Sequence, residues 1–184
     1  MRAFLFGLVL GLLIVPAGVY YYFASGSVPT ASSAEAMPFE KVLARQALHA
    51  RMEKEAPKSV GLQWDEANLT GGAEIYVKHC AVCHGLPGQE ATPIAKGMYP
   101  KPPALTEGKG VTDDPPQESY WKVSNGMRLT GMPAFKGSLS DTQIWQVSLF
   151  VANADKLPPA AKQVLLRPLA TSAPVGMSGT PTTK

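Results

Sequence analysis

The two cysteines of this 184-residue chain, Cys80 and Cys83, are separated by only two residues, and a histidine follows directly. A disulfide between them would close a loop too short to remove much entropy from the unfolded chain. A structural zinc site needs four ligands, and the remaining histidines, His49 and His79, do not supply a second pair at suitable spacing. Neither a disulfide nor a zinc site therefore explains the cysteine pair.

The segment Cys80-Ala81-Val82-Cys83-His84 has the Cys-x-x-Cys-His spacing of c-type haem attachment. Two thiols about one helical turn apart can reach the two vinyl groups on one edge of a porphyrin, and the histidine can then place its imidazole beneath the iron. A thioredoxin-like redox pair would need a βαβ setting, but the flanking sequence has a helical pattern. We therefore expect one covalently bound haem c, attached to Cys80 and Cys83, with His84 as the proximal iron ligand.

A second axial ligand must come from downstream, where the methionines are Met98, Met127, Met132 and Met177. A neutral thioether raises the haem potential and closes the distal face. We predict Met132, because the preceding glycine lets the backbone approach the porphyrin and the following proline stiffens the segment. Met127 is the alternative. Met98 lies close in sequence to the proximal loop, and Met177 lies in the tail.

Residues 3–24 form a run of 22 residues without a charged side chain. As a helix the run would be roughly 33 Å long, enough to cross the hydrocarbon core of a bilayer. Arg2 precedes it and Tyr20, Tyr21 and Tyr22 end it, as interfacial aromatic residues do. A cleaved signal peptide is the competing interpretation, but its apolar core is usually only ~7–15 residues long. The pattern favours an uncleaved anchor over residues 1–24, with the rest of the chain exported.

The remaining sequence divides into four further segments. Residues 25–37 are small and polar and predict a linker. Residues 38–57 predict an amphipathic helix, whose role the sequence leaves open. Residues 58–168 are expected to form the haem domain, and the low-complexity tail 169–184 is expected to be disordered. The apolar positions of the amphipathic helix are Phe39, Val42, Leu43, Ala47 and Ala50.

Inside the haem domain the periodicity predicts only helices and loops. The first helix is expected from Asn68 or Leu69 to about Val82, with Asn68 as its N-cap. Two more are expected over residues 117–125 and 141–154, the latter with a capping box formed by Ser140 and Gln143. Residues 85–116 are rich in glycine and proline and predict a long loop. The predicted fold class is all-α.

Composition excludes several functions. The net charge is only +3, and no basic block alternates with aromatic residues, so a nucleic-acid partner is not supported. The sequence contains no evident acid–base pair or nucleophile constellation. We therefore assign no catalytic residues and expect an electron carrier rather than an enzyme, without a small-molecule substrate.

Residues 66–157 resemble class I monohaem cytochromes c, in particular membrane-anchored bacterial ones. The likeness rests on the haem motif, on Gly72 and Tyr76 ahead of it, and on the segments Pro102–Leu105 and Asn125–Phe135. The resemblance implies an all-α cytochrome c fold in which the first and last helices cross near the haem edge. The residues expected to meet at this crossing are Gly72, Tyr76, Trp145 and Leu149.

The resemblance also implies further site residues. A proline in the loop after the motif would pack beside the proximal histidine, and a nearby backbone carbonyl would accept its Nδ1–H. Pro102 or Pro103 fits this description. Trp121 and Arg128 are candidates to bind the haem propionates through the indole N–H and the guanidinium group, although solvated surface roles are equally open.

The function expected from these features is one-electron transfer by a His/Met-ligated haem on the periplasmic face of the cytoplasmic membrane. The bilayer would hold residues 3–24, and the partners would be membrane-bound respiratory or dehydrogenase proteins that the sequence does not identify. Two alternatives remain. The protein could be a fixed electron-transfer subunit of a larger membrane oxidoreductase complex, or a haem enzyme or gas sensor with an open distal site.

Overall fold

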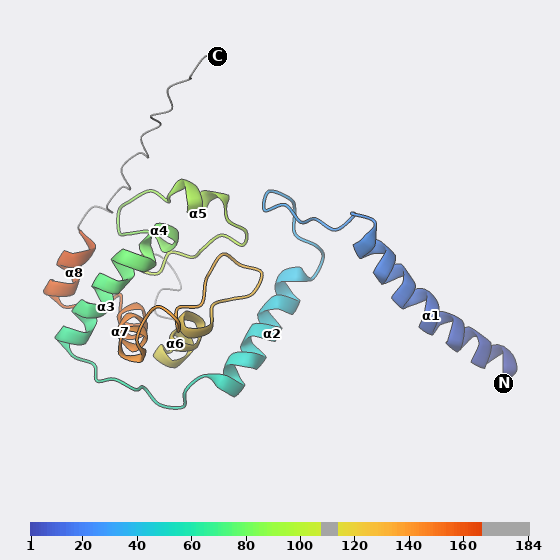
Figure 1. The fold of residues 1–184 in the computed structure, drawn as a ribbon, viewed down its shortest axis with the longest axis horizontal. Helices are drawn as coiled ribbons and strands as arrows, with labels where there is room; N and C mark the ends of the chain where they lie inside the picture. The colour runs from blue at the N-terminus through green and yellow to red at the C-terminus, as the bar shows by residue number, and fades with distance from the viewer. Residues whose placement is uncertain (108–113, 167–184) are drawn as a thin grey trace, which may run out of the picture. The chain divides into compact units, whose positions relative to one another are not determined.

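A computed structural model describes residues 1–107 and 114–166 of the chain, which divides into two compact units. The first unit is Met1–Lys54, and the second begins at Glu55. All regular elements within the described ranges are helices, which confirms the predicted all-α class (Figure 1). The predicted tail, residues 169–184, lies outside the described residues.

The first unit contains helix α1, Arg2–Ala24, and nearly all of helix α2, Glu40–Glu55. Helix α1 is long and apolar enough to cross a membrane, and none of its residues is buried in the protein. Helix α2 occupies the predicted region. Its predicted apolar positions, including Val42 and Leu43, are exposed, and its buried residue is Met52. The less exposed face of α2 is therefore the one through Leu48 and Met52, which lie four residues apart and so on one side of the helix.

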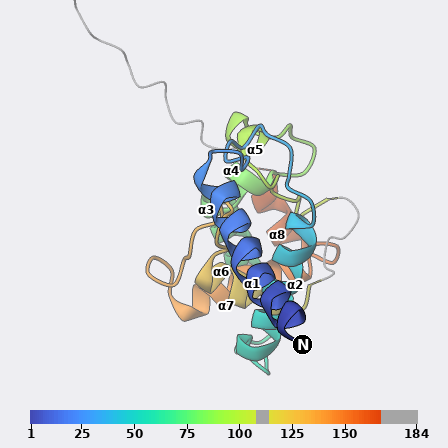
Figure 2. The ribbon, with the colours of Figure 1, turned by 90° about the vertical axis from the view of Figure 1, so that its right-hand side faces the viewer.

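The second unit is built on the packing of helix α3, Glu66–His79, against helix α7, Asp141–Ala152. Helix α6, Pro116–Asn125, packs on α7, and helix α8, Pro159–Leu165, packs on α3 (Figures 1 and 2). The two central helices approach closely at Gly72. A Cβ atom added there would lie 2.2 Å from the backbone oxygen of Gln146 and 2.7 Å from Cβ of Phe150. The absence of a side chain at Gly72 thus permits the helix crossing.

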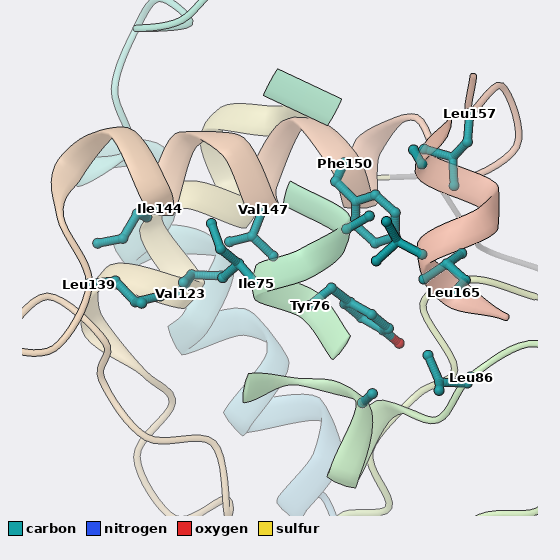
Figure 3. Close-up of a cluster of buried hydrophobic side chains, with 14 residues drawn as sticks. Ile75, Tyr76, Leu86, Val123, Leu139, Ile144, Val147, Phe150, Leu157 and Leu165 are labelled. Atoms are coloured by element: carbon teal, nitrogen blue, oxygen red, sulfur yellow. The ribbon is translucent and has the colours of Figure 1, made fainter. Parts of the chain in front are cut away.

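The core of the second unit surrounds this crossing (Figure 3). The ring of Tyr76 on α3 packs against that of Phe150 on α7, with centroids 5.2 Å apart, and both side chains are fully buried. Further apolar residues from α7, from the other helices and from the loops complete the cluster, among them Leu86, Val123, Leu139, Ile144, Val147, Leu157, Ala161, Val164 and Leu165. The core therefore lies directly behind the helix end that carries the cysteine motif.

The helix ends show one confirmed prediction and one wrong one. At the start of α7, the Ser140 side chain accepts from the Gln143 backbone N–H and the Gln143 side chain accepts from the Ser140 N–H, as the predicted capping box requires. The predicted cap of α3 is wrong. Asp65 is the N-cap, and its carboxylate accepts from the Asn68 backbone N–H at 2.7 Å. A carboxylate at this position satisfies an otherwise unpaired amide and complements the helix dipole.

The described residues include three short helices that the sequence pattern did not predict as separate helices. Helix α4, Ala81–His84, is separated from α3 at Cys80, so α3 does not run on to Val82 as predicted. Helix α5, Pro93–Gly97, lies in the predicted loop and is capped by Thr92. Helices α5 and α8 each begin with a proline, whose missing N–H costs nothing at a first helical position.

Candidate cofactor site

The cysteine motif occupies the single turn of α4 and the residue before it. Its position is set by Tyr76 on α3, whose buried hydroxyl donates to the backbone carbonyl of Gly85 at 2.8 Å, one residue after His84. Burial is the largest cause that raises the pKa of Tyr76, with the nearby Cys80 adding to the shift. The hydroxyl therefore remains a donor throughout the physiological pH range and holds the end of the motif against the core.

His84 is oriented by a second hydrogen bond. Its Nδ1 lies 2.8 Å from the carbonyl oxygen of Pro103. Because a carbonyl can only accept, Nδ1 carries the proton and Nε2 keeps its lone pair. Burial lowers the pKa of His84, against the opposing effect of the Pro103 carbonyl, so the imidazole is held in its neutral form. A neutral imidazole with a free Nε2 is the form that binds iron.

The segment that carries Met132 is a strap, residues 127–135, which follows α6 and is closed by one hydrogen bond within the strap and one back to α6. The Met127 N–H donates to the Met132 carbonyl at 3.2 Å, and the Phe135 N–H donates to the Val123 carbonyl at 3.0 Å. Gly126 makes this closure possible. It has φ +65°, and a Cβ atom there would lie 2.7 Å from the backbone of Pro133 and Ala134.

The motif and the strap line one cavity with an empty volume of about 750 Å³, counting the space open to solvent at its mouth. Both cysteines contribute to it, and they are not joined in a disulfide. Burial is the main cause that raises the pKa of Cys80 to about 12, and Cys83 adds to the effect, so the Cys80 thiol is uncharged in this apolar setting. The other lining residues include His84, Met98, Pro103, Leu105, Met127, Met132, Phe135, Val147 and Val151.

This lining has the composition that a haem needs. A planar apolar cofactor requires an apolar cavity, two thiols for attachment and a neutral nitrogen for the iron, and all are present on its wall. The predicted residues Cys80, Cys83, His84, Pro103 and Met132 thus come together around a single space. The chemistry of this donor set fits haem c.

Trp121 and Arg128 are not among the residues that line the cavity. The Trp121 indole N–H donates to the Glu55 carboxylate at 3.2 Å, and Arg128 is exposed on the strap. That they bind the haem propionates therefore stays a prediction. Conversely, Met98 lines the cavity, although its place near the proximal loop in sequence argued against it as the distal ligand. Met98 reaches the cavity only because the loop that carries it folds across the cavity.

Comparison with known proteins agrees with this geometry. Residues 67–151 match the family described as cytochrome c oxidase, cbb3-type, subunit III. The chain is 38% identical over 86 residues to cytochrome c6 of Leptolyngbya boryana, which covers 46% of this chain and 91% of that protein. The chain belongs to the class I c-type cytochromes. Cytochrome c6 of Limnospira maxima is 30% identical over 86 residues, with 47% of this chain and 92% of that protein covered.

A solved structure also matches this cytochrome. It is a chain of the reducing HAO-like protein complex of Kuenenia stuttgartiensis, with a TM-score of 0.43 and 28% sequence identity over 52% of this chain. The match spans about half of that solved chain, 48% of its length.

Membership of the family has two consequences. This c-type cytochrome carries covalently bound haem c, and the Cys80–His84 segment fits the attachment motif. The same matches support electron transfer as the activity of a c-type cytochrome.

Proposed function

We propose that this cytochrome transfers single electrons between membrane-bound redox proteins at the outer face of the cytoplasmic membrane, through a haem ligated by His84 and Met132. The observation that carries the proposal is the single apolar cavity that the motif and the strap share. Bound there, haem c supplies an iron that alternates between the ferrous and ferric states. The protein residues hold it, exclude water from it and tune its potential.

In this proposal each site residue has one task. The thiols of Cys80 and Cys83 form the two thioether bonds, which prevent loss of the cofactor outside the cell. The Pro103 carbonyl fixes the imidazole of His84 so that Nε2 would be free to bind the iron, and hydrogen bonds of this kind raise the basicity of a histidine ligand. Met132 would supply a thioether as the second ligand, which would favour the ferrous state and leave no open coordination site for a substrate.

The proposed location rests on helix α1, which is long and apolar enough to span a bilayer. A tether holds a carrier near its membrane partners at high effective concentration, and residues 25–37 set the reach of the domain. Electron-transfer encounters are usually small and transient, so such a tether is useful to a carrier.

A second candidate function is that of a fixed electron-transfer subunit of a larger oxidoreductase complex. The family description as an oxidase subunit supports it, as do the exposed apolar side chains of Phe39, Val42 and Leu43. Purification in mild detergent distinguishes the two, because a mobile carrier travels alone and a fixed subunit travels with its complex.

The axial ligation is tested by Met132→Ala in the haem-loaded full chain. We expect the absorption band of oxidised sulfur-ligated haem, near the red end of the visible, to disappear. The reduction potential should fall, and the ferrous protein should bind carbon monoxide readily, because the thioether no longer stabilises ferrous iron or closes the distal face.

Met127→Ala is the matched control, since Met127 also lines the cavity on the same strap. It should keep the band and exclude carbon monoxide. If Met132→Ala retains the band while Met127→Ala loses it, Met132 is not the ligand. If the unmodified protein lacks the band and binds carbon monoxide, the carrier function is rejected in favour of an open distal site.

A further inference from the structure

The loop of residues 92–103 is fixed to the cysteine motif at both of its ends. At the start, the Thr92 hydroxyl donates to the carbonyl oxygen of Val82, between the two cysteines, at 2.6 Å. At the end, the Pro103 carbonyl accepts from Nδ1 of His84 at 2.8 Å. The loop is therefore attached to the same turn, α4, that presents the proximal histidine.

Met98 lies midway along this loop and reaches the strap. A Cβ atom added to Gly131 would lie 2.0 Å from Cε of Met98 and 3.4 Å from its Sδ. The methyl group of Met98 thus rests against the bare Cα of Gly131, and both residues line the cavity. Gly131 directly precedes Met132, so this contact joins the histidine-side loop to the residue before the proposed distal ligand.

Met132 and Phe135 pack against the core, but the strap between Arg128 and Gly131 has little other packing. Some of its hydrogen bonds connect strap residues to one another, as the bond from Met127 N–H to the Met132 carbonyl does. Others connect the strap to α6, as the bond from Phe135 N–H to the Val123 carbonyl does. Leu129, at its tip, is 92% exposed and has φ +60°, and Gly131 and Pro133 are exposed as well. The tip of the strap therefore opens easily, because few apolar contacts oppose its motion.

We propose that Met98 is a positioning residue that holds the strap against the histidine-side loop and so keeps the thioether of Met132 on the iron. The inference rests on the proposed ligation by Met132. Thioethers fill irregular gaps well, and a glycine opposite leaves the space for one. A ligand is held in place only when the residues around it are themselves fixed by packing. Met98 supplies this contact from an element that is already attached to the haem motif.

The test measures how easily imidazole displaces the distal ligand from the oxidised, haem-loaded full chain. We expect Met98→Ala to raise the affinity for imidazole roughly tenfold, a typical effect of removing a residue that supports a metal ligand. The sulfur–iron absorption band should weaken without being lost. Met98→Leu, which restores most of the apolar contact, should return both readouts close to those of the unmodified protein.

Ile94→Ala is the matched control. Ile94 is a large apolar residue of the same loop, is 59% exposed, and does not line the cavity. Its loss should leave the imidazole affinity and the band unchanged. If Ile94→Ala has the same effect as Met98→Ala, general loosening of the loop is responsible and the inference is rejected.

Gly131→Ala probes the contact from the other side, because the added Cβ must displace the methyl group of Met98. It should also raise the imidazole affinity, and it should add little in a Met98→Ala background, since the contact is then already absent. The single Gly131→Ala variant keeps the inference testable if Met98→Ala does not accumulate with haem, and an unchanged imidazole affinity in it would then overturn the inference.

Two results would overturn the inference while leaving the proposed ligation by Met132 intact. One is an unchanged imidazole affinity in both Met98→Ala and Gly131→Ala. The other is full additivity of these two substitutions. Persistence of the band in Met132→Ala would instead reject the proposed ligation. Loss of the band in Met98→Leu together with its persistence in Met132→Ala would make Met98 the ligand, and would overturn both.

Discussion

At the scale of single residues, the two adjacent glycines of α3 differ sharply in their surroundings. Gly72 faces the backbone of α7, whereas Gly71 faces only the side chain of Gln146. A Cβ atom at Gly71 would lie 3.1–3.3 Å from Gln146 side-chain atoms, which can move aside. The requirement for glycine at the helix crossing is therefore specific to one of the two positions.

We expect Gly72→Ala to destabilise the haem-loaded protein by roughly 2–3 kcal/mol, because the added Cβ forces α3 and α7 apart. Gly71→Ala should be close to neutral or stabilising, since alanine is favoured over glycine in a helix by up to ~1 kcal/mol. Guanidinium denaturation in detergent measures both free energies of unfolding. Equal losses of stability in the two variants would contradict the close approach at Gly72.

At the scale of elements, the start of α3 determines how the motif meets the core. Asp65 caps the helix through the Asn68 N–H, while the Asn68 side chain bonds Gln63 and accepts from Gln146 on α7. Asn68 therefore connects α3 to α7 and is not the N-cap of α3. A correctly capped α3 positions Tyr76, and through it the carbonyl that follows the motif.

Asp65→Ala should lower the free energy of unfolding by about 1 kcal/mol, because one amide of the first turn loses its acceptor. Asp65→Asn should retain most of the stability, since asparagine caps helices nearly as well. Circular dichroism during chemical denaturation measures the difference. A loss in Asp65→Asn as large as in Asp65→Ala would indicate that charge, rather than capping, stabilises the helix start.

At the scale of the whole molecule, the protein combines a membrane-crossing candidate helix with a haem domain. The two compact units meet in the sequence at the end of α2, where Glu55 of the second unit accepts from Trp121 of the same unit. This hydrogen bond accounts for the position of the Trp121 indole. Its N–H is bound to a carboxylate, and the residue does not line the cavity.

Replacing residues 1–24 with a cleavable signal peptide should release the cytochrome into the soluble periplasmic fraction with its absorption spectrum unchanged. The physical reason is that α1 holds no buried residue and so contributes nothing to the haem domain core. The unmodified protein should remain in membranes after an alkaline wash, with an intact N-terminus by mass spectrometry. A soluble, shortened natural protein would show instead that residues 1–24 are a signal sequence.

Features that depend on neighbouring residues were predictable from the sequence. The attachment motif, the capping box of Ser140 and Gln143, and the apolar run of residues 3–24 are each encoded within one short segment. Helical periodicity also identified α2, α3, α6 and α7, with errors of a few residues at their ends. Local interactions determine these features, so no knowledge of the fold was needed.

Features that depend on distant segments required the tertiary structure. The partner of Trp121 is 66 positions away, and the contact of Met98 with Gly131 appears only when the loop of residues 92–103 folds across the cavity. Helix α8 is short and has no strong sequence pattern of its own, and its buried residues Ala161, Val164 and Leu165 are recognised only from the packing of α8 on α3. Sequence alone thus determined which cofactor this chain binds and through which motif, since covalent attachment is a local pattern. The tertiary structure alone decided which side chains enclose it, because close packing selects partners by position in space and not by distance along the chain.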